Sequence, residues 1–131
     1  MTEKVAANSL VAGDHGTTYG GNPFACAAIS KVLDIFEEDG ILEHVRKVAP
    51  YLEKRLDELA AKYDCIETRR GSGLMQGLVF GKPVADIINR ALDKGLILIN
   101  AGTNIIRFVP PLVISEADID AMIAILDTCI E

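Results

Sequence analysis

Apolar residues in the first half of the chain recur at steps of three and four positions, the spacing that places them on one face of a helix. From Asn22 and Pro23 this pattern continues to Gly40, and it predicts a helix that Asn22 caps and Pro23 opens. A second stripe predicts a long amphipathic helix over residues 42–59, with His44 on its solvent face. The members of this stripe are Leu42, Val45, Ala49, Leu52, Leu56 and Leu59.

The second half of the chain changes to short apolar runs bounded by glycine and proline, a pattern typical of β-strands. Two pairs of such runs flank the glycine-containing segments Gly71-Ser72-Gly73 and Gly102-Thr103, so each pair is expected to form a hairpin. The predicted strands cover residues 65–70, 74–80, 96–100 and 104–109.

Helical spacing returns between the two hairpins and again after them. One predicted helix covers residues 84–92 and ends before Gly95, and another begins where Ser115 and Asp118 form a capping pair. The predicted order of elements is therefore α-α-β-β-α-β-β-α. Because the strands come as hairpins, we expect an α+β fold with a small antiparallel sheet of about four strands and helices on one face.

Composition and charge limit the classes of protein to which the chain can belong. It has 131 residues, of which 50% are apolar and 24% charged, as expected for a globular domain. The formal net charge is −6 and no run of basic residues, Arg69-Arg70 included, is longer than two, so we expect no nucleic-acid partner. No apolar stretch reaches the ~18 residues of a membrane span, so no membrane association is expected. Three widely spaced cysteines predict reduced core thiols, no metal site and a cytoplasmic location; they are Cys26, Cys65 and Cys129.

A glycine-rich loop precedes the first predicted helix and is the first candidate site. Residues 13–23 read Gly-Asp-His-Gly-Thr-Thr-Tyr-Gly-Gly-Asn-Pro. Glycine N–H groups, the hydroxyls of Thr17 and Thr18, and a helix N-terminus are the parts of a phosphate-binding cradle. The same residues also suit a tight turn followed by a capped helix. The residues alone leave both interpretations open.

Arg107 is the second candidate. Strand alternation places it on the same face as Ile105 and Val109, so its guanidinium leaves an apolar strand. Because an unpaired buried charge is costly, a carboxylate partner is expected. That partner can be an acidic residue of the chain or a bound ligand, and the pattern does not decide between them.

Taken together, these segments resemble the C-terminal part of class III pyridoxal-phosphate-dependent aminotransferases, and within that family the acetylornithine branch. The resemblance covers essentially the whole chain in order. Besides the glycine-rich loop, it includes the sequence Arg-Gly-Ser-Gly-Leu-Met at residues 70–75. It continues in residues 105–112, which include the paired prolines Pro110 and Pro111, and in the helix pattern over residues 115–130.

The resemblance implies a role for each candidate residue. Gly16 and Thr18 would contact the phosphate of pyridoxal 5′-phosphate in the neighbouring subunit of a homodimer. Thr17 would lie beside them, near the substrate. Arg107 would bind a carboxylate of the amino-acid or 2-oxo-acid substrate, for which bidentate guanidinium geometry is suited.

The resemblance also implies that this chain holds no catalytic residue. The Schiff-base lysine of the family belongs upstream of the glycine-rich loop, and none of the chain's lysines has its sequence context. We therefore expect a fragment, with residues 1–22 carrying the cofactor-phosphate loop and residues 23–131 forming the small C-terminal domain. Transamination between N-acetylornithine and 2-oxoglutarate, a step of arginine biosynthesis, is expected of the full-length parent and not of this chain alone.

Two alternatives stay open. Class III aminotransferases for ornithine, succinylornithine or 4-aminobutyrate share these motifs, because the large domain mainly selects the substrate. A stand-alone α+β module that binds a small molecule also fits the two ββα-like units. A stand-alone module would not explain the run of glycine and threonine residues before the first helix.

Overall fold

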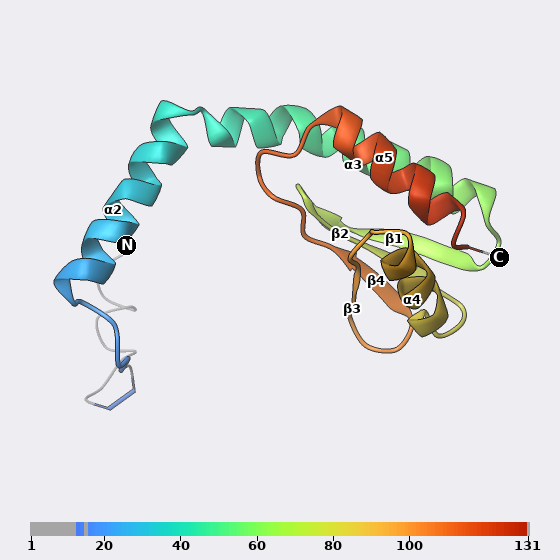
Figure 1. Cartoon of the computed structure of the whole chain (residues 1–131), viewed down its shortest axis with the longest axis horizontal. Helices are drawn as coiled ribbons and strands as arrows, with labels where there is room; N and C mark the ends of the chain where they lie inside the picture. Colours follow the sequence, from blue (N-terminus) through green and yellow to red (C-terminus); the bar gives the residue numbers. More distant parts are fainter. Residues whose placement is uncertain (1–12, 15, 131) are drawn as a thin grey trace, which may run out of the picture. The chain divides into compact units, whose positions relative to one another are not determined.

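The computed structural model describes residues 13–14 and 16–130, and its element order confirms the predicted α-α-β-β-α-β-β-α. The chain divides between Asp39 and Gly40 into two compact units, and each is described by itself. The division expected at residues 22 and 23 stays a prediction. The elements in Figure 1 are α2 (Pro23–Glu38), α3 (Ile41–Lys62), β1 (Ile66–Ser72), β2 (Met75–Phe80), α4 (Ala85–Asp93), β3 (Ile99–Asn100), β4 (Ile105–Phe108) and α5 (Glu116–Asp127).

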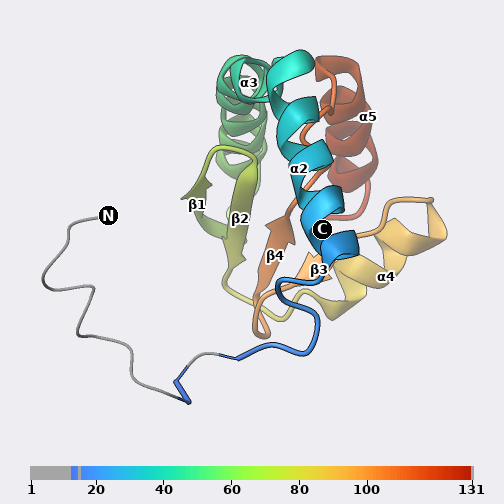
Figure 2. The same cartoon turned by 90° about the vertical axis from the view of Figure 1, so that its left-hand side faces the viewer.

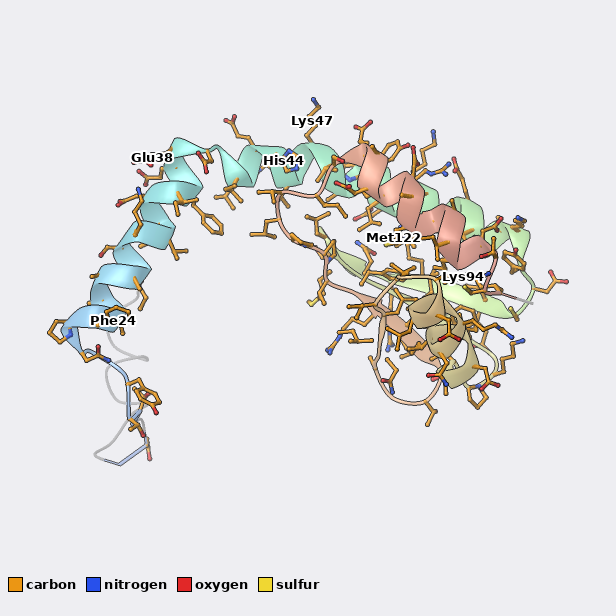
Figure 3. The ribbon with its side chains drawn as sticks, in the orientation of Figure 1. Phe24, Glu38, His44, Lys47, Lys94 and Met122 are labelled. Atoms are coloured by element: carbon orange, nitrogen blue, oxygen red, sulfur yellow. The ribbon has the colours of Figure 1, made fainter. Side chains whose placement is uncertain are left out.

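The first unit is a loop followed by α2, and the helix begins as predicted. The side chain of Asn22 accepts a hydrogen bond from the N–H of Ala25 at 2.9 Å, and Pro23 occupies the first helical turn. No residue of α2 is buried, and Phe24 at its start is 85% exposed (Figure 3). Cys26 is also exposed, so its prediction as a core thiol is wrong. The helical period is therefore confirmed, but its apolar stripe is not buried.

The second unit contains one four-stranded antiparallel sheet in the order β1-β2-β4-β3 (Figure 2). The β1–β2 hairpin turns at Gly73 and Leu74, because Gly71 and Ser72 still pair with β2 residues. Gly73 has a φ of 59°, which a glycine adopts without strain. At its other end, β1 pairs irregularly between Ile66 and Thr68.

Helices cover one face of this sheet, as predicted. In the second unit α3 contacts β1 and β2, α4 contacts β3, and α5 packs beside α3 (Figure 1). Cys129 is buried in this core and Cys65 lies at its edge. On the other face Met75, Ile99 and Arg107 are exposed. The largest fully buried side chains include Leu52, Leu56, Leu78, Phe80, Ile106, Ile119 and Leu126.

His44 connects α3 to the segment before α5. Its Nε2 lies 2.9 Å from the carbonyl oxygen of Ile114, and the side chain is half-buried (Figure 3). The prediction that it faces solvent is wrong, because this segment passes over α3 at that point. Immediately afterwards Ser115 and Asp118 form the predicted capping box of α5. Among the described residues, no helix has the length and apolar character needed to cross a membrane.

Candidate functional site

The glycine-rich loop of the first unit presents two hydroxyls before a helix N-terminus. Gly16, Thr17 and Thr18 are exposed, and within the described residues neither threonine hydroxyl makes a hydrogen bond. A Cβ atom at Gly20 would collide with the methyl group of Thr17, so a side chain there would force Thr17 to move. His15 lies outside the described residues. The loop therefore leaves free donors of the kind that a phosphate ester binds.

Hydrogen bonds hold this loop next to α2. The amide nitrogen of Asn22 donates to the carbonyl of Tyr19, while its amide oxygen caps the helix. The side chain of Asn22 thus stabilises both the turn and the start of the helix. The first-turn N–H groups and the positive end of the helix dipole lie next to the threonines along the chain. The donor set fits the phosphate of the cofactor that the family resemblance implies.

Arg107 lies on β4 in the second unit, where it pairs with Gly77 of β2 and Ile99 of β3. Its alternation with Ile106 and Phe108, which are buried, confirms the predicted strand face. The side chain is exposed, and within residues 13–14 and 16–130 it makes no hydrogen bond or ion pair. The sequence left two kinds of partner open for Arg107, an acidic residue of the chain or a bound ligand. No acidic residue among the described residues pairs with it.

A shallow hollow of about 380 Å³ lies beside Arg107 on the open face of the sheet. Arg70 of β1 is on its opposite side, and Gly77 lies between the two strands that carry them. The sequence marks Arg70 as part of a two-residue basic run and of the family resemblance, but it does not place this residue near Arg107. Part of the signal is local, since residues 70 and 77 are equally distant from a turn at residues 73 and 74. The pairing of Gly77 with Arg107 is long-range and has no such local signal. Met75, Ala101 and Ile105 supply apolar walls.

The groups with shifted pKa values lie outside both candidate sites. A hydrogen bond from the Ser115 hydroxyl lowers the pKa of Asp118, and the Lys62 ammonium lowers that of Asp127. The hydrogen bond from Tyr51 to Asp120 raises the pKa of the tyrosine. These interactions join α3 to α5 or cap α5, so they stabilise the fold. Among the described residues, no three His, Cys, Asp or Glu side chains are grouped to bind a metal ion.

Comparison with known proteins shows the family to which the chain belongs. The aminotransferase class-III family matches residues 1–130, and the chain belongs to this family. Among solved structures, an acetylornithine aminotransferase from Elizabethkingia anophelis is similar with a TM-score of 0.80 and 29% identity, over 92% of this chain and 33% of that one. A lysine aminotransferase from M. tuberculosis has a TM-score of 0.81 and 32% identity, over 91% of this chain and 28% of that one.

Two curated relatives are both named as acetylornithine aminotransferases. The chain is 44% identical to the mitochondrial acetylornithine aminotransferase of Saccharomyces cerevisiae over 132 aligned positions, which cover 100% of this chain and 31% of the yeast protein. It is 42% identical to the acetylornithine aminotransferase of Gloeobacter violaceus over 88% of this chain and 29% of that protein. The chain therefore spans about a third of the length of the curated relatives that it matches.

Proposed function

We propose that this chain forms the small C-terminal domain of an acetylornithine aminotransferase, which exchanges an amino group between N-acetylornithine and 2-oxoglutarate in arginine biosynthesis. The observation that carries the proposal is Arg107, an exposed guanidinium without an ion-pair partner among the described residues, in a chain that belongs to the class-III family. The names of the relatives support the choice of substrate. The parent protein acts in the cytoplasm in this proposal, although the yeast relative is named as mitochondrial.

The glycine-rich loop serves the cofactor. Pyridoxal 5′-phosphate, when bound, supplies the electron sink that amino-group transfer needs. Gly16 donates its backbone N–H and Thr18 its hydroxyl to the cofactor phosphate in the neighbouring subunit of a homodimer. Thr17 lies toward the substrate. The exposed loop and its unpaired hydroxyls support these roles.

Arg107 orients the substrate. Its planar guanidinium donates two parallel hydrogen bonds to a carboxylate, and it does so equally for an amino acid and for a 2-oxo acid. An enzyme that binds two such substrates in turn needs a group of this kind. We assign no catalytic residue to this chain, because none of its lysines has the sequence context of the family's Schiff-base lysine.

The proposal is tested on the native protein that contains this chain. We expect N-acetylornithine to be a better amino donor than ornithine, succinylornithine or 4-aminobutyrate. Arg107→Gln is expected to lower kcat/KM for 2-oxoglutarate by about a hundredfold, the loss of one charge-assisted bidentate contact. Thr18→Val is expected to weaken retention of the cofactor about tenfold, as measured by fluorescence during dialysis. Arg46→Gln, at an exposed position of α3, is the matched control.

Each alternative gives a different result. Preference for one of the other amino donors would assign the protein to another branch of the class. Tight calorimetric binding of arginine or ornithine by the 131-residue chain itself would favour a stand-alone binding module. Borohydride trapping of pyridoxal phosphate on one stoichiometric lysine of this chain would contradict the absence of a catalytic residue.

A further inference from the structure

Gln76 of β2 is a polar residue in an otherwise apolar core. It is 2% exposed, and in the described part of the chain it is the only buried residue of polar or charged type. Strand alternation places its side chain on the covered face of the sheet, together with the buried Leu78 and Phe80. An amide in such a place is costly unless its donors and its acceptor are hydrogen-bonded. Its partners therefore indicate why it is there.

Both ends of the Gln76 amide have partners. The amide nitrogen donates to Oε1 of Glu53 at 3.1 Å and to the carbonyl oxygen of Gly73 at 2.7 Å. The amide oxygen accepts from Nη1 of Arg69 at 2.9 Å. A guanidinium can only donate, whereas carboxylate and carbonyl oxygens can only accept, so these partners fix the orientation of the amide. One N–H group is thus used for α3 and the other for the hairpin turn.

Two of these three bonds belong to a network that joins the sheet to α3. Glu53 and Asp57 lie four positions apart in α3, and therefore on one side of the helix. Asp57 binds Arg69 of β1 with a distance of 2.6 Å from Nε to Oδ1, while Glu53 binds Gln76 of β2. The bond between Arg69 and Gln76 closes the network. This part of the arrangement stabilises the fold.

The third bond reaches the turn of the hairpin. Gly73 belongs to neither strand, since β1 ends at Ser72 and β2 begins at Met75. Gly71 allows Gln76 to come this close. Its φ is 144°, and a Cβ atom there would lie 2.8 Å from Oε1 of Gln76 and would collide with the carbonyl oxygen of Met75. The absence of a side chain at Gly71 therefore leaves room for the buried amide next to the turn.

The same hairpin forms part of the hollow beside Arg107. Gly71 and Met75, which lie on either side of the turn, both line this hollow. We propose that Gln76 is a positioning residue for the substrate, because its bond to Gly73 fixes the turn and, through it, the wall of the hollow next to Arg107. The inference rests on the proposed function, which places a substrate carboxylate at Arg107. The side chain of Gln76 lies on the covered face and touches no substrate itself.

The test separates the bond to Gly73 from the network with α3. Gln76→Glu, Glu53→Gln and the double variant that exchanges the two groups are compared in the native protein that contains this chain. Gln76→Glu places two carboxylates next to each other and removes both N–H donors, so it is expected to lower the urea midpoint and to raise KM for 2-oxoglutarate. Glu53→Gln keeps an acceptor for Gln76 and is expected to leave KM unchanged. An unfolded fraction lowers the apparent kcat and not KM, so the two constants distinguish a displaced wall from a lost fold.

The double variant gives the sharpest result. Its amide at position 53 donates to its carboxylate at position 76, and this carboxylate accepts from Arg69, so the urea midpoint is expected to return. The carboxylate has no N–H group to donate to the carbonyl of Gly73. KM for 2-oxoglutarate is therefore expected to stay raised by about fivefold, the factor that corresponds to one neutral hydrogen bond, while kcat changes by less than about twofold.

Two further variants complete the comparison. Gln76→Met is uncharged, has a similar volume and loses the bond to Gly73, so it is expected to show the same rise in KM. The result therefore does not depend on whether the acidic variants fold. Asn89→Asp makes the same change from amide to acid at an exposed position of α4 and is the matched control. It is expected to leave both KM and kcat unchanged.

The outcomes separate this inference from the proposed function. If the double variant recovers KM together with the urea midpoint, or if Gln76→Met leaves KM unchanged, Gln76 only stabilises the fold and the inference is wrong, while the role of Arg107 stands. If Asn89→Asp raises KM as much as Gln76→Glu, the effect reports added charge and the inference is also overturned. If Arg107→Gln leaves kcat/KM for 2-oxoglutarate unchanged, the proposed function fails in its assignment of the carboxylate, whatever the Gln76 variants show.

Discussion

An arginine on one face of the sheet and an arginine on the other face lie in opposite environments. On the helix-covered face, Arg69 donates to both carboxylate oxygens of Asp57 and to the side chain of Gln76. On the open face, the adjacent Arg70 has no such partner among the described residues. Strand alternation alone separates the two side chains. The arginine on the covered face is bound within the fold, whereas the arginine on the open face has no partner among the described residues.

The largest expected difference between the faces is in apolar packing. Phe80→Ala removes a fully buried ring from the covered face and is expected to lower the free energy of unfolding by about 3–5 kcal/mol. Met75→Ala, at a side chain 61% exposed on the open face, is expected to change it by no more than about 0.5 kcal/mol. Urea denaturation of both variants measures the contrast. Equal losses would mean that the open face is packed in solution.

A smaller difference is expected for the arginines. The side chain of Arg69 is 20% exposed, and its loss leaves Asp57 and Gln76 without this donor. Arg69→Gln is therefore expected to cost about 1 kcal/mol in unfolding free energy. Arg70→Gln is the matched variant one residue further along, and it is expected to stay within about 0.5 kcal/mol of the parent chain. A comparable loss in both would contradict the division of roles between the faces.

The smallest expected effect is the response of the helical layer to acid. Because the folded state lowers the pKa values of Asp118 and Asp127, it favours their ionised forms. Their contribution to stability is complete above the ordinary carboxyl pKa and is lost as the pH falls through the lowered values. Denaturation between about pH 6 and pH 3 measures this decline. Asp118→Asn is expected to flatten the curve, and Arg70→Gln to leave its slope unchanged.

Local signals in the sequence predicted most of the fold. The stripe that contains Leu52 and Leu56 is buried as expected, and Asn22 and Ser115 cap the helices that they were predicted to start. Periodicity and capping depend on residues a few positions apart, so a sequence shows them directly. Strand β3 is much shorter than predicted. Residues 96–98 do not join β3, because the N–H of Leu96 bonds to Ala91 and closes the end of α4.

Contacts between distant segments were not predicted. His44 meets Ile114, which is 70 positions away, and no local pattern marks that pair. The exposure of Phe24 also depends on what lies around α2 rather than on its helical period. Arg107 was found because its charge interrupts an apolar strand. Its relation to Arg70 was missed, because it requires the register of three strands at once.

The edges of the sheet have a consequence for the chain in concentrated solution. A long, regular edge strand offers unpaired backbone groups that recruit strands from other molecules and start aggregation. Here β3 has only two residues, and β1 carries charged side chains and an irregular pairing near Ile66. Both borders are thus poor templates for further strands. The sheet is protected against edge-to-edge growth while its open face stays accessible.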